Sequence, residues 1–172
     1  MRLVCILLLA ASAFAAPSAQ LLTKAPVRFE PNQGQSNRSV LWAARGLGYS
    51  IGFTRDATLL QLGSRTISMR LPGQDLKAPF EAAVPFSAST NYITPAYRGS
   101  VPAYGRLRRQ RIYPGIDIVY YGNGDRLEYD FEIAPGADPS RIRMHFDGAD
   151  RVRLAENGDL LLELGGKILT QH

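Results

Sequence analysis

An unbroken alternation of apolar and charged residues runs from Arg126 to Ile133, and it constrains the fold of this 172-residue chain more than any other feature. The apolar members occupy every second position: Leu127, Tyr129, Phe131 and Ile133. Because side chains alternate between the two faces of a β-strand, the pattern predicts a strand with one buried face and one charged face. Residues 116–121 form a second β-rich run, and the Gly122-Asn123-Gly124-Asp125 segment between the runs predicts a hairpin turn.

Short alternating runs punctuated by turn residues continue on both sides of this hairpin. They cover residues 40–44, 49–53, 57–62 and 67–71 before it, and residues 142–146, 152–154, 160–164 and 168–170 after it. Turn signals at spacings of about 8–12 residues are typical of all-β folds. We therefore predict an all-β, antiparallel β-sandwich of short strands and hairpins, with a barrel as the alternative.

Other stretches predict loops or interruptions of the sandwich. The proline-containing segment 72–89 is expected to form a long loop or a crossover between sheets, followed by a short strand at 91–93 and a loop at 95–102. Asp138 is expected to cap a single helical turn that opens with Pro139. Because the last run, 168–170, reaches almost to the C-terminus, the sandwich is expected to be incomplete there and the chain to be a fragment or a truncated gene product.

The N-terminus has the pattern of an export signal. Arg2 is followed by the apolar run Leu3–Ala11, which is too short to span a bilayer, and Ala13-Phe14-Ala15 fits the motif that signal peptidase recognises. We expect residues 1–15 to be a signal peptide cleaved after Ala15, with Ala19 as an alternative site, and the chain to be secreted or held at a bacterial cell surface. A retained membrane anchor is disfavoured by the length of the run.

The remaining residues are expected to form an irregular segment at 16–38 and a β-sandwich domain at 39–172. The only cysteine, Cys5, lies early in the apolar run, which argues against lipidation and leaves an exported chain without disulfides. Removal of residues 1–15 takes away one charge, that of Arg2, and lowers the net charge from +5 to +4. Export makes nucleic acid an unexpected partner, whereas a modest positive charge is compatible with anionic envelope polymers.

Two groups of residues are candidates for ligand binding. Four arginines lie in one charged run: Arg106, Arg108, Arg109 and Arg111. Such a run indicates either a polyanion-binding patch or a solvated strand, and in both cases we expect Arg108 and Arg109 to face solvent. Tyrosines also concentrate in this region, and Tyr121 is the candidate for stacking on a sugar ring. Tyr120 and Tyr121 point to opposite faces, so at least one of them is expected in the core, and Tyr129 belongs to the apolar face.

Catalytic and metal-binding interpretations are weaker. Glu128, Asp130 and Glu132 share a strand face and lie within the spacing of a glycosidase pair, but any acidic strand face has this spacing. Asp117 is expected to accept hydrogen bonds from turn amides, and the glycine-rich turn at 122–125 lacks the further acids of a calcium loop. We therefore expect a non-enzymatic protein with no cofactor and no metal site.

Several motifs occur in an order that resembles a known family. They are Phe29–Gln35, Ala44–Tyr49, Tyr113–Gly122, Leu127–Phe131 and Ala134–Pro139. Together they resemble the N-terminal domain of unknown function found in bacterial secreted proteins with SBBP (seven-bladed β-propeller) repeats, over about residues 28–172. The resemblance implies export, an all-β fold and a position at the head of a multidomain protein, and it brings no catalytic residues.

The resemblance and the residue patterns together predict a non-enzymatic exported β-sandwich module with a structural or interaction role. The partners would be propeller or Ig-like domains of a longer protein. The first alternative is a module that binds carbohydrate or another envelope polymer, and a glycoside hydrolase is the least favoured.

Overall fold

The computed structural model describes residues 2–8, 26–46, 48–124 and 126–171, with the backbone alone for residues 2–8. Apart from one 3-10 turn, η1 (Pro139–Arg141), the regular elements of these residues are strands. The strands are β1 (Arg2–Leu8), β2 (Arg28–Pro31), β3 (Trp42–Gly46), β4 (Tyr49–Phe53), β5 (Ala57–Leu62), β6 (Arg65–Arg70), β7 (Phe80–Pro85), β8 (Thr90–Ile93), β9 (Arg98–Val101), β10 (Tyr104–Tyr113), β11 (Ile116–Asn123), β12 (Arg126–Ile133), β13 (His145–Asp147), β14 (Arg151–Leu154), β15 (Leu160–Leu164) and β16 (Lys167–Gln171).

Fourteen of the strands form one long antiparallel sheet. Its order is β13-β6-β5-β4-β3-β2-β10-β11-β12-β1-β16-β15-β14, with β7 paired to β10, and β8 and β9 form a separate hairpin. Most neighbours in the sheet are also neighbours in the chain, because short turns connect them. Each strand pair in the described chain is antiparallel, which confirms the predicted all-β antiparallel class.

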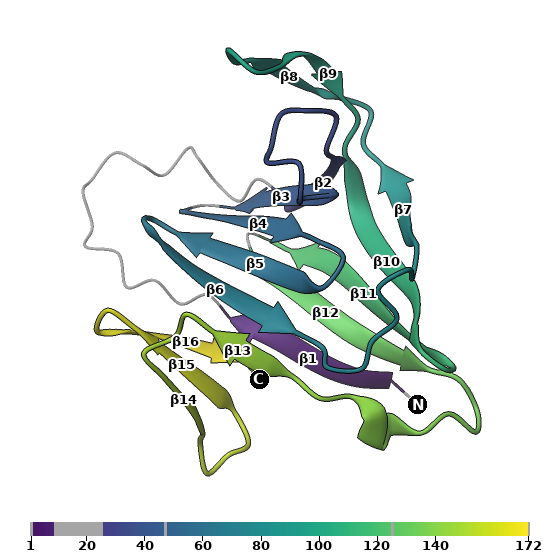
Figure 1. Ribbon diagram of the computed structural model, residues 1–172, viewed down its shortest axis with the longest axis vertical. Helices are drawn as coiled ribbons and strands as arrows, with labels where there is room; N and C mark the ends of the chain where they lie inside the picture. The colour runs from purple at the N-terminus through teal and green to yellow at the C-terminus, as the bar shows by residue number, and fades with distance from the viewer. Residues whose placement is uncertain (1, 9–25, 47, 125, 172) are drawn as a thin grey trace.

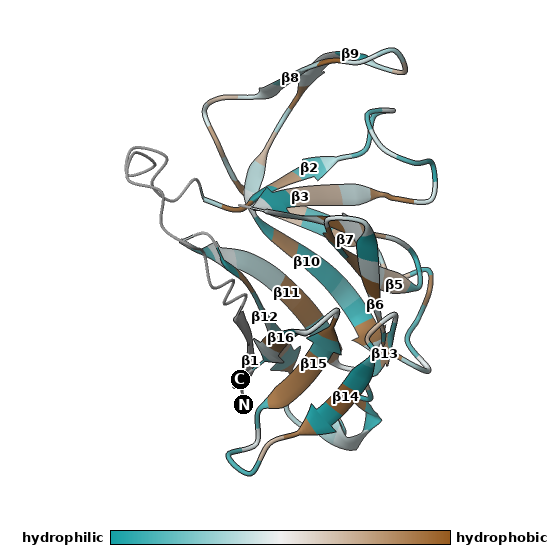
Figure 2. Cartoon of the chain, turned by 90° about the vertical axis from the view of Figure 1, so that its left-hand side faces the viewer, coloured by the Kyte–Doolittle hydropathy of each residue, from teal (hydrophilic) through white to brown (hydrophobic). Residues whose placement is uncertain are grey.

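The sheet curls so that its two halves pack face to face (Figure 1). β4, β5 and β6 lie over β11 and β12, and the ring centroids of Phe53 and Tyr120 are 4.7 Å apart across the interface. The Tyr120 hydroxyl and Thr58 Oγ1 form a hydrogen bond of 3.0 Å between the same layers. Brown bands in Figure 2 mark the apolar residues along the strands. The buried ones form the core between the layers, as in a sandwich.

The central hairpin has the predicted register. β11 and β12 pair from Ile116↔Ile133 to Asn123↔Arg126, and Leu127, Tyr129 and Phe131 are at most 2% exposed. The acidic face of β12 is less solvated than the alternation predicts, because Glu128 and Asp130 are also buried. Their carboxylates accept hydrogen bonds from Asn123 Nδ2 (2.8 Å) and the Tyr121 hydroxyl (3.1 Å).

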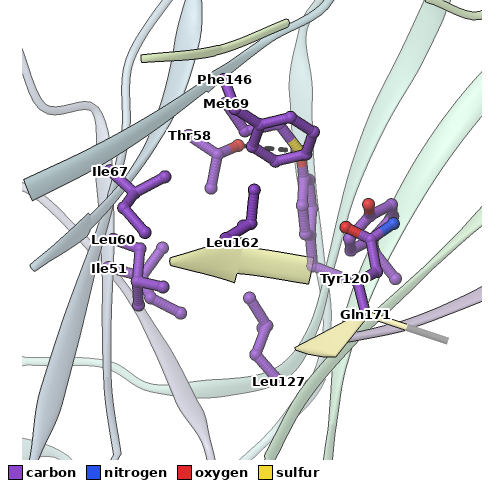
Figure 3. A pocket seen from close by; sticks show the side chains of 11 residues that line it. Ile51, Thr58, Leu60, Ile67, Met69, Tyr120, Leu127, Phe146, Leu162 and Gln171 are labelled. Carbon is purple, nitrogen blue, oxygen red and sulfur yellow. Dashed lines mark hydrogen bonds between the residues drawn. The ribbon is translucent and has the colours of Figure 1, made fainter. Parts of the chain in front are cut away.

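The space between the two layers is nearly filled. The pocket in Figure 3 has a volume of about 30 Å³ and is lined mainly by apolar side chains of both layers, among them Ile51, Leu60, Leu127 and Leu162. Ligand pockets in proteins are usually about 300–1,000 Å³, so this cavity is a small packing defect of the core.

The structure differs from the sequence prediction in four segments. β7 and β9 lie in the segments predicted to be loops, and only the last two residues of the run 142–146 belong to a strand, β13. β2 lies within the segment predicted to be irregular, and its Phe29 is fully buried, so the sheet begins before residue 39. β7 was not predicted because its sequence shows no clear alternation, and a positive φ of 61° at Val84 interrupts the strand.

The N-terminal prediction is only partly covered by the described residues. Residues 2–8 form β1, which pairs with β12 and β16, while both predicted cleavage sites lie outside the described residues. A search of the described residues for a helix long and apolar enough to cross a membrane finds none.

Candidate interaction site

Two of the four predicted arginines form an ion-pair network on the outer face of β10–β12. Arg108 Nε donates to Asp117 Oδ2 (2.7 Å), and Arg108 Nη2 lies 3.1 Å from Glu132 Oε2. Arg106 Nη2 donates to the other Glu132 oxygen at 3.2 Å. The two carboxylates offset the charge of both arginines, so this face is a mixed-charge surface and not a strongly positive patch.

Asp117 has the structural role that its position predicted. A β-bulge in β10 between Arg109 and Tyr113 places Arg111 at a φ of 51°, in the left-handed region. The Arg111 amide donates to Asp117 Oδ1 at 2.6 Å, so this carboxylate secures both the bulge and Arg108. Within the described residues, the exposed Arg111 guanidinium makes no hydrogen bond or ion pair. It borders a surface pocket of about 370 Å³ lined also by Arg108, Asp117 and Glu132.

Arg109 does not face solvent, and its predicted exposure is wrong. It lies on the inner side of β10 and is 5% exposed, with its guanidinium 5.2 Å from the centroid of the Phe80 ring. Its nitrogens donate to the Gln74 side chain (2.7 Å) and to the carbonyl oxygens of Arg55 (2.5 Å), Asp75 (3.1 Å) and Ala78 (3.3 Å). Burial lowers the pKa of Arg109, although a guanidinium stays protonated in proteins. Arg109 therefore holds the loop 71–79 against the sheet.

Tyr121 lies on the outer face, opposite Arg106 in the register of β10 and β11. Burial and the hydrogen bond that its hydroxyl donates to Asp130 raise the pKa of Tyr121 to about 12. The structure thus brings Arg106, Arg108 and Tyr121 to one face, but their polar groups are bonded to the sheet itself.

A second surface, which the sequence prediction missed, is the hairpin arm, defined here as residues 86–103. It consists of β8 and β9 and their connections, and it projects from one end of the sheet (Figure 1). A backbone hydrogen bond from Phe86 N to Ala103 O (2.9 Å) closes its base.

A buried carboxylate anchors the hairpin arm to the sheet. Glu30 of β2 is 6% exposed and accepts hydrogen bonds from Thr90 Oγ1 and the Tyr92 hydroxyl. The guanidinium of Arg45 lies 5.2 Å from the centroid of the Tyr92 ring, and that of Arg28 lies 4.8 Å from the centroid of Phe86. Because a buried carboxylate is costly without hydrogen bonds, the arm and the sheet are coupled through Glu30.

The loop after β2 supports the other side of the hairpin arm. Asn32 organises this loop: its Oδ1 accepts from the amides of Gly34 (3.0 Å) and Ser36 (3.1 Å), and its Nδ2 donates to the carbonyl oxygen of Val40 (2.7 Å). Gln33 Oε1 then accepts a hydrogen bond from the Tyr97 hydroxyl at 2.8 Å. The motif Phe29–Gln35 therefore builds the base on which the arm rests.

The tip of the hairpin arm is exposed. Ile93 is 80% exposed, the highest value among the exposed large hydrophobic residues of the described chain. A surface pocket of about 400 Å³ lies beside it, lined by Ile93, Thr94, Pro95, Ala96, Tyr97 and Arg98. Ile93 and this pocket are therefore both open to solvent at the tip of the hairpin arm. In the sequence, this hairpin is indicated by the alternation over Thr90–Ile93 and the Thr94-Pro95 turn that follows it.

The anchoring of the hairpin arm predicts a loss of stability in alkali. Burial and the hydrogen bond to Glu30 raise the pKa of Tyr92 to about 12, and burial raises that of Tyr120 to about 12. Between about pH 10 and pH 12 the unfolded chain releases these protons while the folded chain keeps them, so the free energy of unfolding falls. Urea unfolding at pH 9 and pH 11 measures the change, and Tyr92→Phe should make it smaller. Equal stability at both pH values would contradict the burial of these phenols.

The fold and the site define an antiparallel all-β domain with an anchored hairpin arm. Residues 60–172 match the protein family described as "Domain of unknown function (DUF7948)", and the chain belongs to this family. No curated protein and no solved structure matches the chain. The family confirms the predicted domain of unknown function, while the link to SBBP-repeat proteins stays a prediction.

Proposed function

We propose that this protein is a non-enzymatic exported module that contacts another polypeptide through the hairpin arm. In this proposal residues 1–15 are removed on export to the bacterial surface or medium, and the module resembles the N-terminal domain of SBBP-repeat proteins. The polypeptide it contacts is then a propeller or Ig-like domain of a longer protein.

The observation that carries the proposal is the contrast between the base and the tip of the hairpin arm. At the base, Glu30 and Gln33 hold Tyr92 and Tyr97 in fixed positions. At the tip, Ile93 is exposed on a short hairpin that pairs with no other strand of the described sheet. A rigidly held apolar contact loses little conformational entropy on binding, which favours association.

The outer face of the sheet supports the non-enzymatic part of the proposal. A hydrolase would need free carboxylates on this face. Each of the four candidates accepts a hydrogen bond from a neighbouring group of the same sheet: Asp117, Glu128, Asp130 and Glu132. A general acid or base must instead reach the substrate. These carboxylates are used to hold the strands and the bulge together.

Site-specific photo-crosslinking in the exporting host tests the polypeptide contact. A photoreactive residue at Ile93 should yield a discrete cross-linked polypeptide, because this side chain would lie in the interface. The same residue at Leu154, which is 71% exposed on β14, is the matched control and should not yield that product. N-terminal sequencing of the exported chain should find Ala16 as the first residue. Identical products from both positions, or a chain that still begins at Met1, would contradict the corresponding part of the proposal.

One observation favours the alternative of an envelope-polymer-binding module. The pocket beside Arg111 combines an exposed guanidinium with the carboxylates of Asp117 and Glu132, and such mixed polar linings suit a sugar polymer that carries charges. Binding of purified envelope polysaccharide that is lost in Arg111→Ser and kept in Arg98→Ser would select this alternative, because both arginines are exposed and only Arg111 lines that pocket.

A further inference from the structure

β1 occupies a position between two strands that have no other connection to each other in the described sheet. Residues 2–6 of β1 pair antiparallel with Glu128–Glu132 of β12, and Leu7 and Leu8 pair antiparallel with Gln171 and Thr170 of β16 (Figure 1). Because β12 and β16 are both antiparallel to β1, they run parallel to one another. The two pairings follow one another along β1: it leaves β12 after Ile6 and meets β16 from Leu7, so it bridges the two strands.

The space that β1 fills lies directly over the core. On β12, Tyr129 and Phe131 are 2% and 0% exposed, and on β15 and β16 Leu162 and Leu169 are 1% and 6% exposed. Removal of β1 would leave the β12 backbone without its partner on that side. It would also leave β14–β16 connected to the larger part of the sheet by side-chain packing and by the Arg65–Asp150 ion pair, without strand pairing. Open sheet edges of this kind pair readily with other chains.

The register defines the chemistry of a strand that fits this position. Alternate residues of such a strand lie opposite Tyr129 and Phe131, whose side chains belong to the core. The residues between them lie opposite Glu128, Asp130 and Glu132 on the acidic face. Cross-strand pairs of opposite charge stabilise antiparallel sheets, so a fitting strand has apolar residues at the first set of positions and basic residues at the second.

We propose that the space between β12 and β16 is a strand-acceptor site for an extended segment of a partner polypeptide with alternating apolar and basic residues. The site becomes free when residues 1–15 are removed, so the inference rests on the export step of the proposed function. The partner strand adds to β12 in the antiparallel direction, by the mode of β-strand addition, in which backbone hydrogen bonds supply affinity and alternate side chains supply selectivity.

A nicked full-length chain tests the proposal. A specific protease site is inserted after Ala16, the folded chain is cut, and fluorescent peptides are added. The probe is a synthetic peptide with the sequence of residues 2–8. We expect it to exchange with the cut fragment, with one peptide bound per chain, and to restore the amide protection of Glu128–Glu132.

Two peptide variants with the same new side chain separate strand addition from unspecific binding. Val4→Lys places lysine opposite Asp130 and should bind more tightly by about 1.5- to 5-fold, the range for a favourable cross-strand pair. Cys5→Lys places lysine opposite buried Tyr129 and should abolish binding. Equal binding of both variants would overturn the proposed register.

Three other results would overturn the acceptor site. The first is a cut chain that releases the fragment and still protects the amides of β12 without any peptide. The second is a cut chain that unfolds and binds no peptide. The third is a cut chain that closes the site by forming a dimer with a second copy. None of these results depends on whether the leader is removed on export, which N-terminal sequencing measures separately.

Discussion

Replacing Phe131 by alanine is expected to lower the free energy of unfolding by about 3–5 kcal/mol, the usual range for a buried aromatic residue truncated to alanine. Phe131 is fully buried on the inner face of β12, and its ring packs edge-on against Tyr129 at 5.9 Å between centroids. The total free energy of unfolding of a domain is only about 5–15 kcal/mol, so this single change should remove a large part of the stability and unfold part of the population. Chemical denaturation followed by tyrosine fluorescence or circular dichroism measures the loss.

Glu132→Ala is the matched control for Phe131→Ala, because the two residues are adjacent on β12. The Glu132 side chain is 25% exposed and forms ion pairs with Arg106 and Arg108, whose side chains are each 42% exposed. Ion pairs at the surface contribute about 0–1 kcal/mol, so this loss should be much smaller. Equal losses in the two variants would refute the assignment of an inner and an outer face to this strand.

Arg109→Met is expected to lower the free energy of unfolding by about 2–4 kcal/mol, although arginine is usually a surface residue. Methionine keeps part of the side-chain volume but removes the guanidinium that donates to the carbonyl oxygens of Arg55, Asp75 and Ala78. A hydrogen bond to a charged group contributes about 1.5–3 kcal/mol net, and the desolvation of the guanidinium offsets part of the sum. Thermal unfolding should show the loss, and proteolysis should show early cleavage within residues 71–79.

Arg108→Ser provides the comparison for Arg109→Met. Arg108 neighbours Arg109 in sequence and carries the same charge, but it lies on the outer face. Its replacement by serine should therefore lower the free energy of unfolding by less than about 1 kcal/mol. If both variants lost the same stability, the placement of Arg109 in the interior would be incorrect.

The central hairpin could be predicted from sequence because its information is local. A period of two over β12 and a glycine-containing turn fix both the strand and its register with β11. The same period of two identified β3–β6. A separate local signal, the capping pattern of Asp138-Pro139, identified the single helical turn, in which Asp138 Oδ1 accepts from the Ser140 amide at 2.9 Å. Such features depend on residues a few positions apart.

The burial of Arg109 could not be predicted, because its hydrogen-bond partners come from two separate segments that lie far from it in the chain. The Arg55 carbonyl lies 54 residues away in the chain, and the Asp75 and Ala78 carbonyls lie in a loop with no pattern of its own. In sequence, Arg109 is one member of a charged run, and the side chains of such runs are generally expected to be exposed to solvent.

The hairpin arm was missed for a related reason. Glu30 occurs in a polar, irregular motif, and its hydrogen-bond donors lie 60 and 62 residues further along the chain. The alternation within residues 90–93 indicates a short strand, but a short strand alone does not reveal whether it joins the main sheet or projects from it. The contacts of Glu30 with Tyr92 and of Gln33 with Tyr97, which join distant parts of the chain, explain why the arm has a fixed place.

The curled sheet also has a consequence for the order in which the chain folds. Strands β3–β6 and strands β10–β12 are each built from neighbours in sequence, so each group closes short loops and forms rapidly. Their meeting requires Phe53 and Thr58 to find Tyr120 across more than sixty residues, which costs loop-closure entropy before any core is gained. Folding is therefore expected to proceed through two preformed meanders whose docking sets the rate, with the hairpin arm ordered only after Glu30 has been brought beneath it.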